Sequence, residues 1–418
     1  MEEYKVKDLS LAEKGALSIE WAKRQMPVLS MVQRRLEAEK PLESLRIAAC
    51  LHVTKETAVL IHALEVAGAE VSLCASNPLS TQDAVAAALA KEGIHVYAWR
   101  GQSTKDYYEC IRDALNWKPQ ITIDDGADLV TTIHVEQRNL IQGIIGGTEE
   151  TTTGVMRLRA MEREGALRYP IIAVNDARSK NLFDNPIGTG QSTLDGIMRA
   201  TNVLIAGKNV VVVGFGQVGS GIAERARGLG AKVTIVEVDP FRALRAAMLG
   251  FNVASMNEAS SYGDLFITAT GNIKAIRGDH FLKMKDGAIL ANSGHFDVEI
   301  CKEDLEALSI SKRWIRDCVD EYLLRNGKRL YLLAEGRLVN LACAEGHPSE
   351  VMDLSFSIQA LSIEYIAKNA RKLPVKVLEV PKEVDEEVAR LKLRSMGLSL
   401  EELTEEQRAY MKGWVSGT

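Results

Sequence analysis

One run of the sequence, VVVVGFGQVGSGIAERARGLGAKVTIVEVD, constrains the fold more than any other part of the chain. It spans residues 210–239 and predicts a buried strand, a glycine turn, a helix and a second strand. Gly214 suits the tight turn, Gly216 lets the backbone approach a pyrophosphate, and Gly219 lets the helix pack closely. The helix N-terminus also favours a negative charge. This combination is typical of a dinucleotide-binding turn.

The acidic residue after the second strand indicates which dinucleotide binds. Glu237 lies roughly 20 residues beyond the glycines, where a carboxylate accepts hydrogen bonds from both ribose hydroxyls. The same carboxylate would repel the 2′-phosphate of NADP. We therefore predict that the cofactor is NAD.

Composition limits the class of protein. The chain has 418 residues, of which 46% are hydrophobic, enough for at least two domains. Its net charge of -5 and its lack of a basic stripe argue against a nucleic-acid partner. No apolar run reaches the roughly 18 residues of a membrane helix. The six cysteines contain no C-x-x-C pair, which suits a reducing compartment, so we expect a cytoplasmic protein.

Alternating apolar and helical patterns predict two doubly wound parallel sheets, an α/β fold. The first series has expected strands at residues 46–51, 71–75, 96–99, 121–123 and 171–174. The second has them at residues 210–213, 233–236, 265–268 and 288–290. A mostly apolar helix at residues 349–367 is expected to be buried at a domain junction or to return to the first domain. We expect a substrate domain of residues 1–180 and 348–378, an NAD-binding domain of residues 181–347, and a small helical oligomerisation arm of residues 379–418.

Polar side chains follow several of these strands, at the sheet edge where open parallel sheets bind ligands. His52 follows one strand, Asp124 and Asp125 follow another, and Asn175 with Asp176 follow a third. Two such edges facing each other would form a cleft. Taken singly, each residue could equally cap a helix. We predict no metal site, because the sequence has no H-E-x-x-H pair and no Cys/His cluster at zinc spacing.

Several longer motifs carry a resemblance to one family. CLHVTKETAVL, STQDAVAAALA, DDGADL, EETTTGV, SKNLFDN, NSGHFDVEI, AEGRLVNLACAEGHPS and the GFGQVG turn occur in this order. Together they resemble S-adenosylhomocysteine hydrolase over nearly the whole chain. The resemblance implies reversible hydrolysis of S-adenosyl-L-homocysteine to adenosine and L-homocysteine. In that family the 3′-hydroxyl is first oxidised by bound NAD, the thiol is then eliminated, water adds, and the ketone is reduced again.

The resemblance also implies roles for individual residues. Lys180 would take the 3′-hydroxyl proton, provided that neighbours or burial lower its pKa, while Glu150 and Asp184 would hold the ribose hydroxyls. His52 and Asp125 would act near C5′, with His295 as a further site histidine. Thr54, Glu56 and His347 would contact the nucleoside. The cofactor contacts implied by the family and the glycine turn are Thr151, Thr152, Thr153, Asn185, Gly214, Gly216, Gln217, Val218, Gly219, Glu237, Asn272, Ser293, Gly294 and Asn340.

The sequence departs from the family pattern at three places. Thr189 stands where many relatives have a cysteine, and Glu345 stands where others have a methionine, close to the expected base pocket. The chain also stops soon after LTEEQRAYM, before the tail that reaches a neighbouring subunit's NAD in longer relatives. We therefore expect a short-tailed form with weaker or differently secured NAD. The family likeness points to a homotetramer.

Three alternatives stay open at this point. The same mechanism could act on S-inosyl-L-homocysteine, in which hypoxanthine replaces adenine. A net NAD-dependent dehydrogenase could share the glycine turn and the two sheets. A catalytically silent regulatory relative could keep the fold, although the candidate catalytic side chains are all present.

Overall fold

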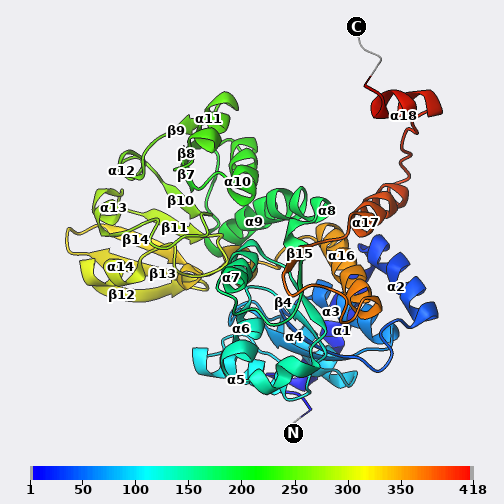
Figure 1. Cartoon of the computed structure of the whole chain (residues 1–418). Helices are drawn as coiled ribbons and strands as arrows, with labels where there is room; N and C mark the ends of the chain where they lie inside the picture. The colour runs from blue at the N-terminus through cyan, green and yellow to red at the C-terminus, as the bar shows by residue number, and fades with distance from the viewer. Residues whose placement is uncertain (1–2, 415–418) are drawn as a thin grey trace.

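The computed structural model describes residues 3–414, so the first two and last four residues of the expected domains lie outside it. The chain forms two lobes, each built around one sheet with helices on its faces (Figure 1). In the described part of the chain, no helix is both long enough and apolar enough to cross a membrane. The expectation of two parallel-dominated α/β units with a short C-terminal helix is confirmed.

The first sheet has seven parallel strands in the order β15-β6-β5-β4-β1-β2-β3. Strand β1 runs in parallel beside both β2 and β4, so the strand order reverses at the β1/β4 edge. The strands are β1 (Arg46–Leu51), β2 (Glu70–Ala75), β3 (His95–Tyr97), β4 (Ile121–Asp124), β5 (Gly146–Glu149), β6 (Ile171–Ala173) and β15 (Val377–Glu379). Ligands of open sheets bind at such a reversal.

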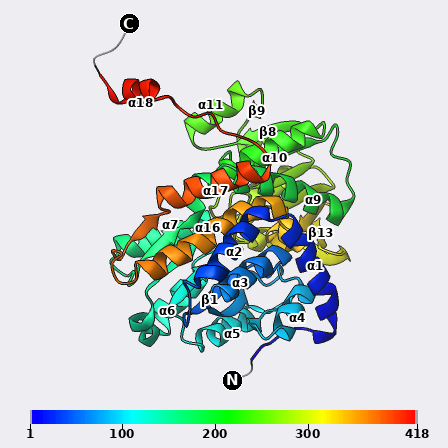
Figure 2. The same cartoon turned by 90° about the vertical axis from the view of Figure 1, so that its right-hand side faces the viewer.

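Helices cover both faces of the first sheet because its strands are apolar on both sides. The helices of the first lobe are α1 (Ala12–Arg24), α2 (Pro27–Glu39), α3 (Lys55–Val66), α4 (Asp83–Lys91), α5 (Thr104–Leu115), α6 (Asp128–Val135), α7 (Thr152–Arg163), α16 (Ser349–Lys368) and α17 (Lys382–Ser395). Pro27 opens α2, a position where its missing N–H costs no helix hydrogen bond. Helix α16 packs on α2, α3 and α17 of the first lobe (Figure 2) and also contacts the turn at residues 184–189.

The second sheet has eight strands in the order β12-β13-β14-β11-β10-β7-β8-β9. They are β7 (Asn209–Val213), β8 (Lys232–Val236), β9 (Asn252–Val253), β10 (Leu265–Thr268), β11 (Ala288–Asn292), β12 (Ser309–Arg316), β13 (Val319–Leu324) and β14 (Arg329–Leu333). The order reverses between β7 and β10, beside the glycine turn. Strand β13 is antiparallel to both of its neighbours, so this sheet is not wholly parallel.

The helices of the second lobe are short, apart from the one that precedes β7 and the one that follows the glycine turn. They are α9 (Gly190–Thr201), α10 (Gln217–Gly228), α11 (Pro240–Met248), α12 (Met256–Ala259), α13 (Gly278–Lys283), α14 (Lys302–Leu308) and α15 (Val339–Ala342). Between the lobes, the short helix α8 (Arg178–Asn181) leads into a π-helical turn at Asp184–Thr189. The last helix, α18 (Glu405–Lys412), projects away from the body of the molecule (Figure 1).

Candidate active site

A cavity of about 380 Å³ is lined by residues from both lobes, at the strand ends of the two sheets. Most of the residues expected from the sequence line it, although they come from segments nearly three hundred positions apart. They are His52, Asp125, Glu150, Thr151, Thr152, Thr153, Lys180, Asp184, Asn185, Gly216, Gln217, Val218, Ser293, Gly294, His295, Asn340 and His347.

The other expected residues lie beside this cavity or behind it. Thr54 and Glu56 line an adjoining cavity of about 40 Å³, which shares His52 and His347 with the larger one. Asn272 does not line either cavity: it is exposed, and its amide oxygen accepts a hydrogen bond from the backbone N–H of Ile273 at 2.8 Å. The two residues before it, Thr270 and Gly271, line the larger cavity, and the cofactor contact expected for Asn272 stays a prediction.

The glycine turn has the shape that a pyrophosphate needs. Gly214 has φ of +99°, and a Cβ on Gly219 would lie 1.9 Å from the Gly214 carbonyl oxygen, so neither position accepts a side chain. A Cβ on Gly216 would meet nothing closer than an Arg242 guanidinium nitrogen at 3.7 Å. The space in front of Gly216 is therefore open toward the cavity, where α10 begins.

Glu237 fixes this turn to the end of β8. Its Oε2 accepts a hydrogen bond from the Phe215 N–H at 2.7 Å, and its Oε1 accepts from the amides of Val238 and Asp239. A carboxylate has about four acceptor positions, so about one is left for a ribose hydroxyl. The expected contact with both hydroxyls would need some of these backbone bonds to give way.

Two buried polar atoms on the cavity wall have no hydrogen-bond partner within the described residues. They are Oε1 of Glu150 and Oδ1 of Asn340. A buried acceptor without a partner is costly, so each is suited to receive a donor from a bound molecule. The open glycine turn and these two acceptors fit a dinucleotide with a polar substrate beside it.

Lys180 is the centre of one cluster in the cavity. It is only 4% exposed, and its ammonium donates hydrogen bonds to Oδ1 of Asn175 at 3.1 Å and Oδ1 of Asn185 at 3.2 Å. The carboxylates of Asp184 and Glu150 lie 3.7 and 3.9 Å from its Nζ. One cation therefore faces two carboxylates and two amide oxygens.

The pKa values in this cluster follow from burial and charge. Burial favours neutral Lys180, but Asp184 and Glu150 outweigh it and raise the pKa of Lys180 above its usual range. Burial raises the pKa of Glu150 to about 8, against the lowering influence of Lys180. In Asp184, by contrast, burial is outweighed by Lys180 and His347, so its pKa is lowered. The condition set for Lys180, a pKa lowered by burial or by neighbours, is therefore not met.

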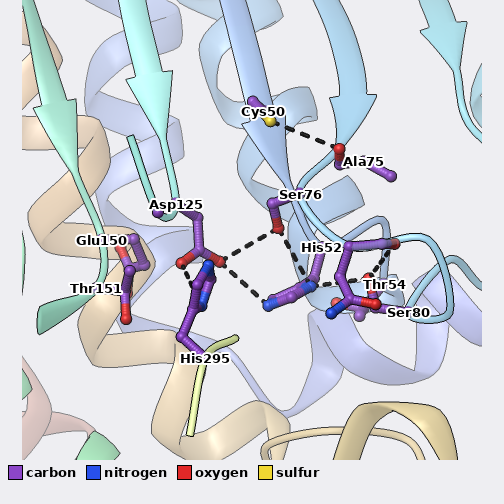
Figure 3. Close-up of polar contacts among 12 residues, drawn as sticks. Cys50, His52, Thr54, Ala75, Ser76, Ser80, Asp125, Glu150, Thr151 and His295 are labelled. Carbon is purple, nitrogen blue, oxygen red and sulfur yellow. Dashed lines mark hydrogen bonds and ion pairs between the residues drawn. The ribbon is translucent and has the colours of Figure 1, made fainter. Parts of the chain in front are cut away.

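His52, Asp125 and His295 form a second cluster (Figure 3). Asp125 lies 3.3 Å from Nε2 of His52 and 3.8 Å from Nδ1 of His295. Ser80 and Ser76 hold Nδ1 of His52 at 2.8 and 3.2 Å. Burial lowers the pKa of His52 to about 4 despite the nearby carboxylate, so this imidazole is neutral at neutral pH.

The second lobe reaches into this cluster at one close contact. Gly126 has φ of +109°, and a Cβ there would lie 2.4 Å from Nε2 of His295. The backbone after β4 must therefore be glycine for His295 to approach. Ligating atoms of His52, Asp125 and His295 lie within 4.8 Å of one another, a grouping that sequence spacing did not reveal. The two histidines already pair with the single carboxylate, and the expected absence of a metal stays a prediction.

Comparisons with known proteins extend over the same residues. Residues 3–142 match the family model described as S-adenosyl-L-homocysteine hydrolase, and residues 185–346 match that of its NAD binding domain. The adenosylhomocysteinase of Sulfolobus acidocaldarius is 61% identical over 416 residues, which cover 100% of both chains. This chain belongs to the S-adenosyl-L-homocysteine hydrolase family. Its cofactor is NAD.

Two further comparisons bear on substrate and fold. The S-inosyl-L-homocysteine hydrolase of Methanopyrus kandleri is 57% identical and covers 100% of this chain and 98% of its own. The sequence identity to this relative, 57%, is thus close to the 61% identity to the adenosylhomocysteinase. A solved structure of dipicolinate synthase from Bacillus halodurans matches with a TM-score of 0.50 at 15% identity, over 78% of this chain and 99% of its own. That likeness shows the fold alone.

Of the three departures from the family pattern, the two substituted side chains, Thr189 and Glu345, both have partners in the structure. The Thr189 hydroxyl lies 2.8 Å from Nε2 of His347, which also lies 3.3 Å from Asp184. The charge of the Glu345 carboxylate is paired with two cations, so it is not an isolated charge near the expected base pocket. Its carboxylate contacts Lys55 at 2.9 Å and Arg199 at 3.2 Å, and Lys55 chiefly lowers its pKa.

Sequence reasoning missed several contributors to this hydrolase-family site, including the Ser76 and Ser80 hydroxyls beside His52. Ser355 and Gln359 of α16 donate hydrogen bonds of 2.6 Å to Asp184 and Glu150, respectively. Both lie on a buried helix, one turn apart, and two polar residues at that spacing could have indicated them. Arg242 lines the cavity near Gly216. It lies six residues after the end of β8, but the sequence does not show that its side chain points into the cavity.

Proposed function

We propose that this chain catalyses the reversible hydrolysis of S-adenosyl-L-homocysteine to adenosine and L-homocysteine. The family membership supports a hydrolase, and one observation supports this reaction in particular. The Lys180 cluster and the His52 cluster line a single cavity that also contains the glycine turn. Such a site offers one group of residues for oxidation of a ribose carbon and another for chemistry at a neighbouring carbon.

The Lys180 cluster would act on the ribose hydroxyls. Glu150 and Asp184 would bind these hydroxyls, and Lys180 would take the 3′-hydroxyl proton. Since the pKa of Lys180 is raised, the ammonium must first pass its proton to a neighbour. Glu150 lies 3.9 Å away, but burial raises its pKa to about 8, so it can accept this proton only in its ionised form, which is the minor form at neutral pH. NAD, when bound, supplies a hydride acceptor that returns the hydride at the end of each turnover.

The His52 cluster would then act at C4′ and C5′. A 3′-ketone acidifies the hydrogen on C4′, and loss of that proton expels the thiolate from C5′. Neutral His52 can accept a proton, while Asp125 orients it and His295 through its two oxygens. The same groups would deliver a proton to the departing sulfur and activate the incoming water. Thr54 and Glu56 would hold the base in the adjoining cavity.

A turnover assay with the NAD-loaded protein tests this proposal. S-adenosyl-L-homocysteine should yield equal amounts of adenosine and free thiol, with no net accumulation of NADH. Absence of thiol release would refute the hydrolase. One NADH formed per product would instead establish the net dehydrogenase alternative.

The base preference is a second question, because the chain also resembles an S-inosyl-L-homocysteine hydrolase. Oε1 of Glu56 accepts a hydrogen bond from Ser349 at 2.6 Å and lies 3.3 Å from the Lys55 ammonium. A carboxylate fixed in this way can accept from the exocyclic amine of adenine, whereas O6 of hypoxanthine would face it with a second acceptor. We therefore favour the adenosyl substrate.

Parallel kinetics with the adenosyl and inosyl thioethers would decide between the two bases. The wild type should have the higher kcat/KM on the adenosyl compound, and Glu56→Gln should shift the ratio of kcat/KM toward the inosyl one, since an amide can donate to O6. Glu345→Gln is the matched control, because it loosens Lys55 but leaves Glu56 in place. A wild-type preference for the inosyl thioether would overturn the assignment.

We further propose the domain division and assembly expected from the sequence. Residues 1–180 and 348–378 would bind substrate, residues 181–347 would bind NAD, and residues 379–418 would serve in assembly of a homotetramer. Within the last range, α17 packs into the first lobe through Val384 and Val388, so α18 and the segment before it are the parts available to another protomer. Six free thiols support a cytoplasmic location.

A further inference from the structure

Two cysteines lie together outside the catalytic clusters. Cys318 occupies the turn between β12 and β13 and has φ of +61°, a conformation uncommon for a residue with a side chain. Cys343 follows α15, in the segment that connects the second lobe to α16. Both are partly exposed, whereas the other four cysteines are buried. The proposed hydrolysis uses neither thiol.

The Cys318 sulfur has three polar neighbours. The Cys318 thiol donates a hydrogen bond to the Ala342 carbonyl oxygen at 3.3 Å and accepts one from Nη2 of Arg100 at 3.9 Å, and the thiol of Cys343, the residue after Ala342, is close enough to influence its ionisation. Nη2 of Arg100 also donates to the Ala342 carbonyl, and Nη1 donates to the carbonyl of Leu79 at 2.5 Å. The guanidinium is thus held between the lobes with one edge against the thiol pair.

Two of these neighbours, Cys343 and Arg100, favour the ionised form of Cys318, whereas the Ala342 carbonyl favours the protonated form. The nearby Cys343 thiol, assisted by the charge of Arg100, lowers the pKa of Cys318 to about 6 in spite of partial burial. Interaction with Cys318 and burial raise the pKa of Cys343. At neutral pH the pair therefore consists of a thiolate and a neutral thiol, the arrangement of an attacking and a resolving cysteine.

We propose that Cys318 and Cys343 form a peroxide-reactive pair that closes to a disulfide. The Cys318 thiolate attacks one oxygen of hydrogen peroxide, the O–O bond breaks, and the departing hydroxide takes a proton to become water. Cys318 is then a sulfenic acid. The Cys343 sulfur attacks it, the S–S bond forms, the S–O bond breaks, and a second water leaves with the Cys343 proton. Two thiols lose two electrons, and one peroxide becomes two waters.

Peptide mapping of the peroxide-treated, NAD-loaded full chain tests the pairing. We expect a loss of two hydrogens, a cross-link between the Cys318 and Cys343 peptides, and reversal by dithiothreitol. In Cys343→Ser, dimedone should trap the sulfenic acid on Cys318. Cys301→Ser, which alters a buried thiol elsewhere, should behave as the wild type. Both thiols left free after peroxide, or Cys318 linked to another cysteine, would overturn the proposal.

The pH dependence of alkylation provides an independent test that does not need disulfide formation. The rate at which iodoacetamide labels Cys318 should rise with a midpoint near pH 6, against about 8.5 for an ordinary thiol. Arg100→Gln should move this midpoint upward, and Arg100→Lys, which keeps a cation, should move it less. A wild-type midpoint near 8.5 would contradict the proposal.

Discussion

At the scale of single residues, two neighbouring acidic pairs follow one rule: the first residue of each pair holds the backbone, and the second lines the cavity. Asp124-Asp125 ends β4, Glu149-Glu150 ends β5, and Asp124 pairs with Glu149 in the sheet register. The first member of each pair accepts backbone N–H hydrogen bonds: Glu149 takes those of Gly126, Ala127 and Thr151. The second member lines the cavity. A buried carboxylate behind each site carboxylate therefore fixes the loop that carries it.

Loss of the Lys180 ammonium should stop the first chemical step. In Lys180→Ala, no group replaces it within reach of the 3′-hydroxyl, so a single turnover with S-adenosyl-L-homocysteine should show at least 100-fold slower appearance of NADH absorbance. Asp125→Asn is the comparison variant: the absorbance should still appear, while release of the thiol slows. A normal NADH burst in the lysine variant would contradict the role proposed for Lys180.

His52 should make the protein less stable in mild acid. Its folded pKa of about 4 lies below the usual 6.5, so the unfolded chain binds the proton more readily between these values. Stability from His52 is complete above pH 6.5 and is lost as the pH falls through 4, by up to about 3 kcal/mol. Urea unfolding from pH 7 to pH 4 should show a shallower decline for His52→Gln. Equal slopes for the two proteins would exclude this contribution.

Much of the site was predictable at this scale because its residues lie in long motifs and directly after strands. His52, Asp125 and Lys180 were all expected, and all line the cavity. Their electrostatic states were not predictable. The pKa of Lys180 depends on Asp184, which is only four residues away in the chain, and on Glu150, which lies within 4 Å only because of the fold.

At the scale of elements, α17 positions the short helix that carries Lys180. Asp385 of α17 accepts hydrogen bonds from the backbone N–H groups of Arg178 and Ser179 at 2.7 and 3.0 Å. These amides begin α8, which has only four residues and cannot be stable alone. The C-terminal region thus contributes to the site through an N-terminal cap supplied from a distant helix.

Removal of that cap should affect both stability and oxidation. Asp385→Ala should lower the free energy of unfolding by roughly 1–2 kcal/mol, the usual value of a lost cap, and should slow NADH formation in a single turnover. Glu386→Ala is the control, since the neighbouring carboxylate makes only an exposed ion pair with Lys382. Asp385→Ala and Glu386→Ala variants with the same NADH rate would show that α17 does not position Lys180.

Two of the strands that the sequence did not predict, β5 and β12, have physical reasons for being missed. Strand β5 reads Gly-Gly-Thr-Glu and lacks an apolar side chain, yet it lies fully buried between β4 and β6. Glycine is required at Gly147, where a Cβ would lie 2.1 Å from the Thr122 hydroxyl. Strand β12 is almost wholly exposed and has three charged residues among its eight, so it lacks the apolar pattern of a buried strand. Both strands are held by their neighbours rather than by their own pattern.

At the scale of the whole molecule, α18 is the best candidate for contact with another protomer. It projects from the body, and the segment around it exposes large apolar side chains: Leu400 (53%), Leu403 (45%), Tyr410 (63%), Met411 (72%) and Trp414 (92%). Replacing Leu403 and Met411 by serine should shift the mass measured by light scattering from a tetramer to a smaller species. The control is Glu406→Gln, on the same helix. A tetramer that persists in the double variant would exclude this surface.

The two passages of chain between the lobes are themselves parts of the site. The outgoing one, residues 184–189, carries Asp184 and Asn185, and the returning one, residues 339–348, carries Asn340 and His347. Any rotation of one lobe against the other must bend these passages and so displace the groups that would grip ribose and nucleotide. Entry of a substrate and completion of its binding pocket would then be a single mechanical event, and a half-open molecule would hold its ligand poorly.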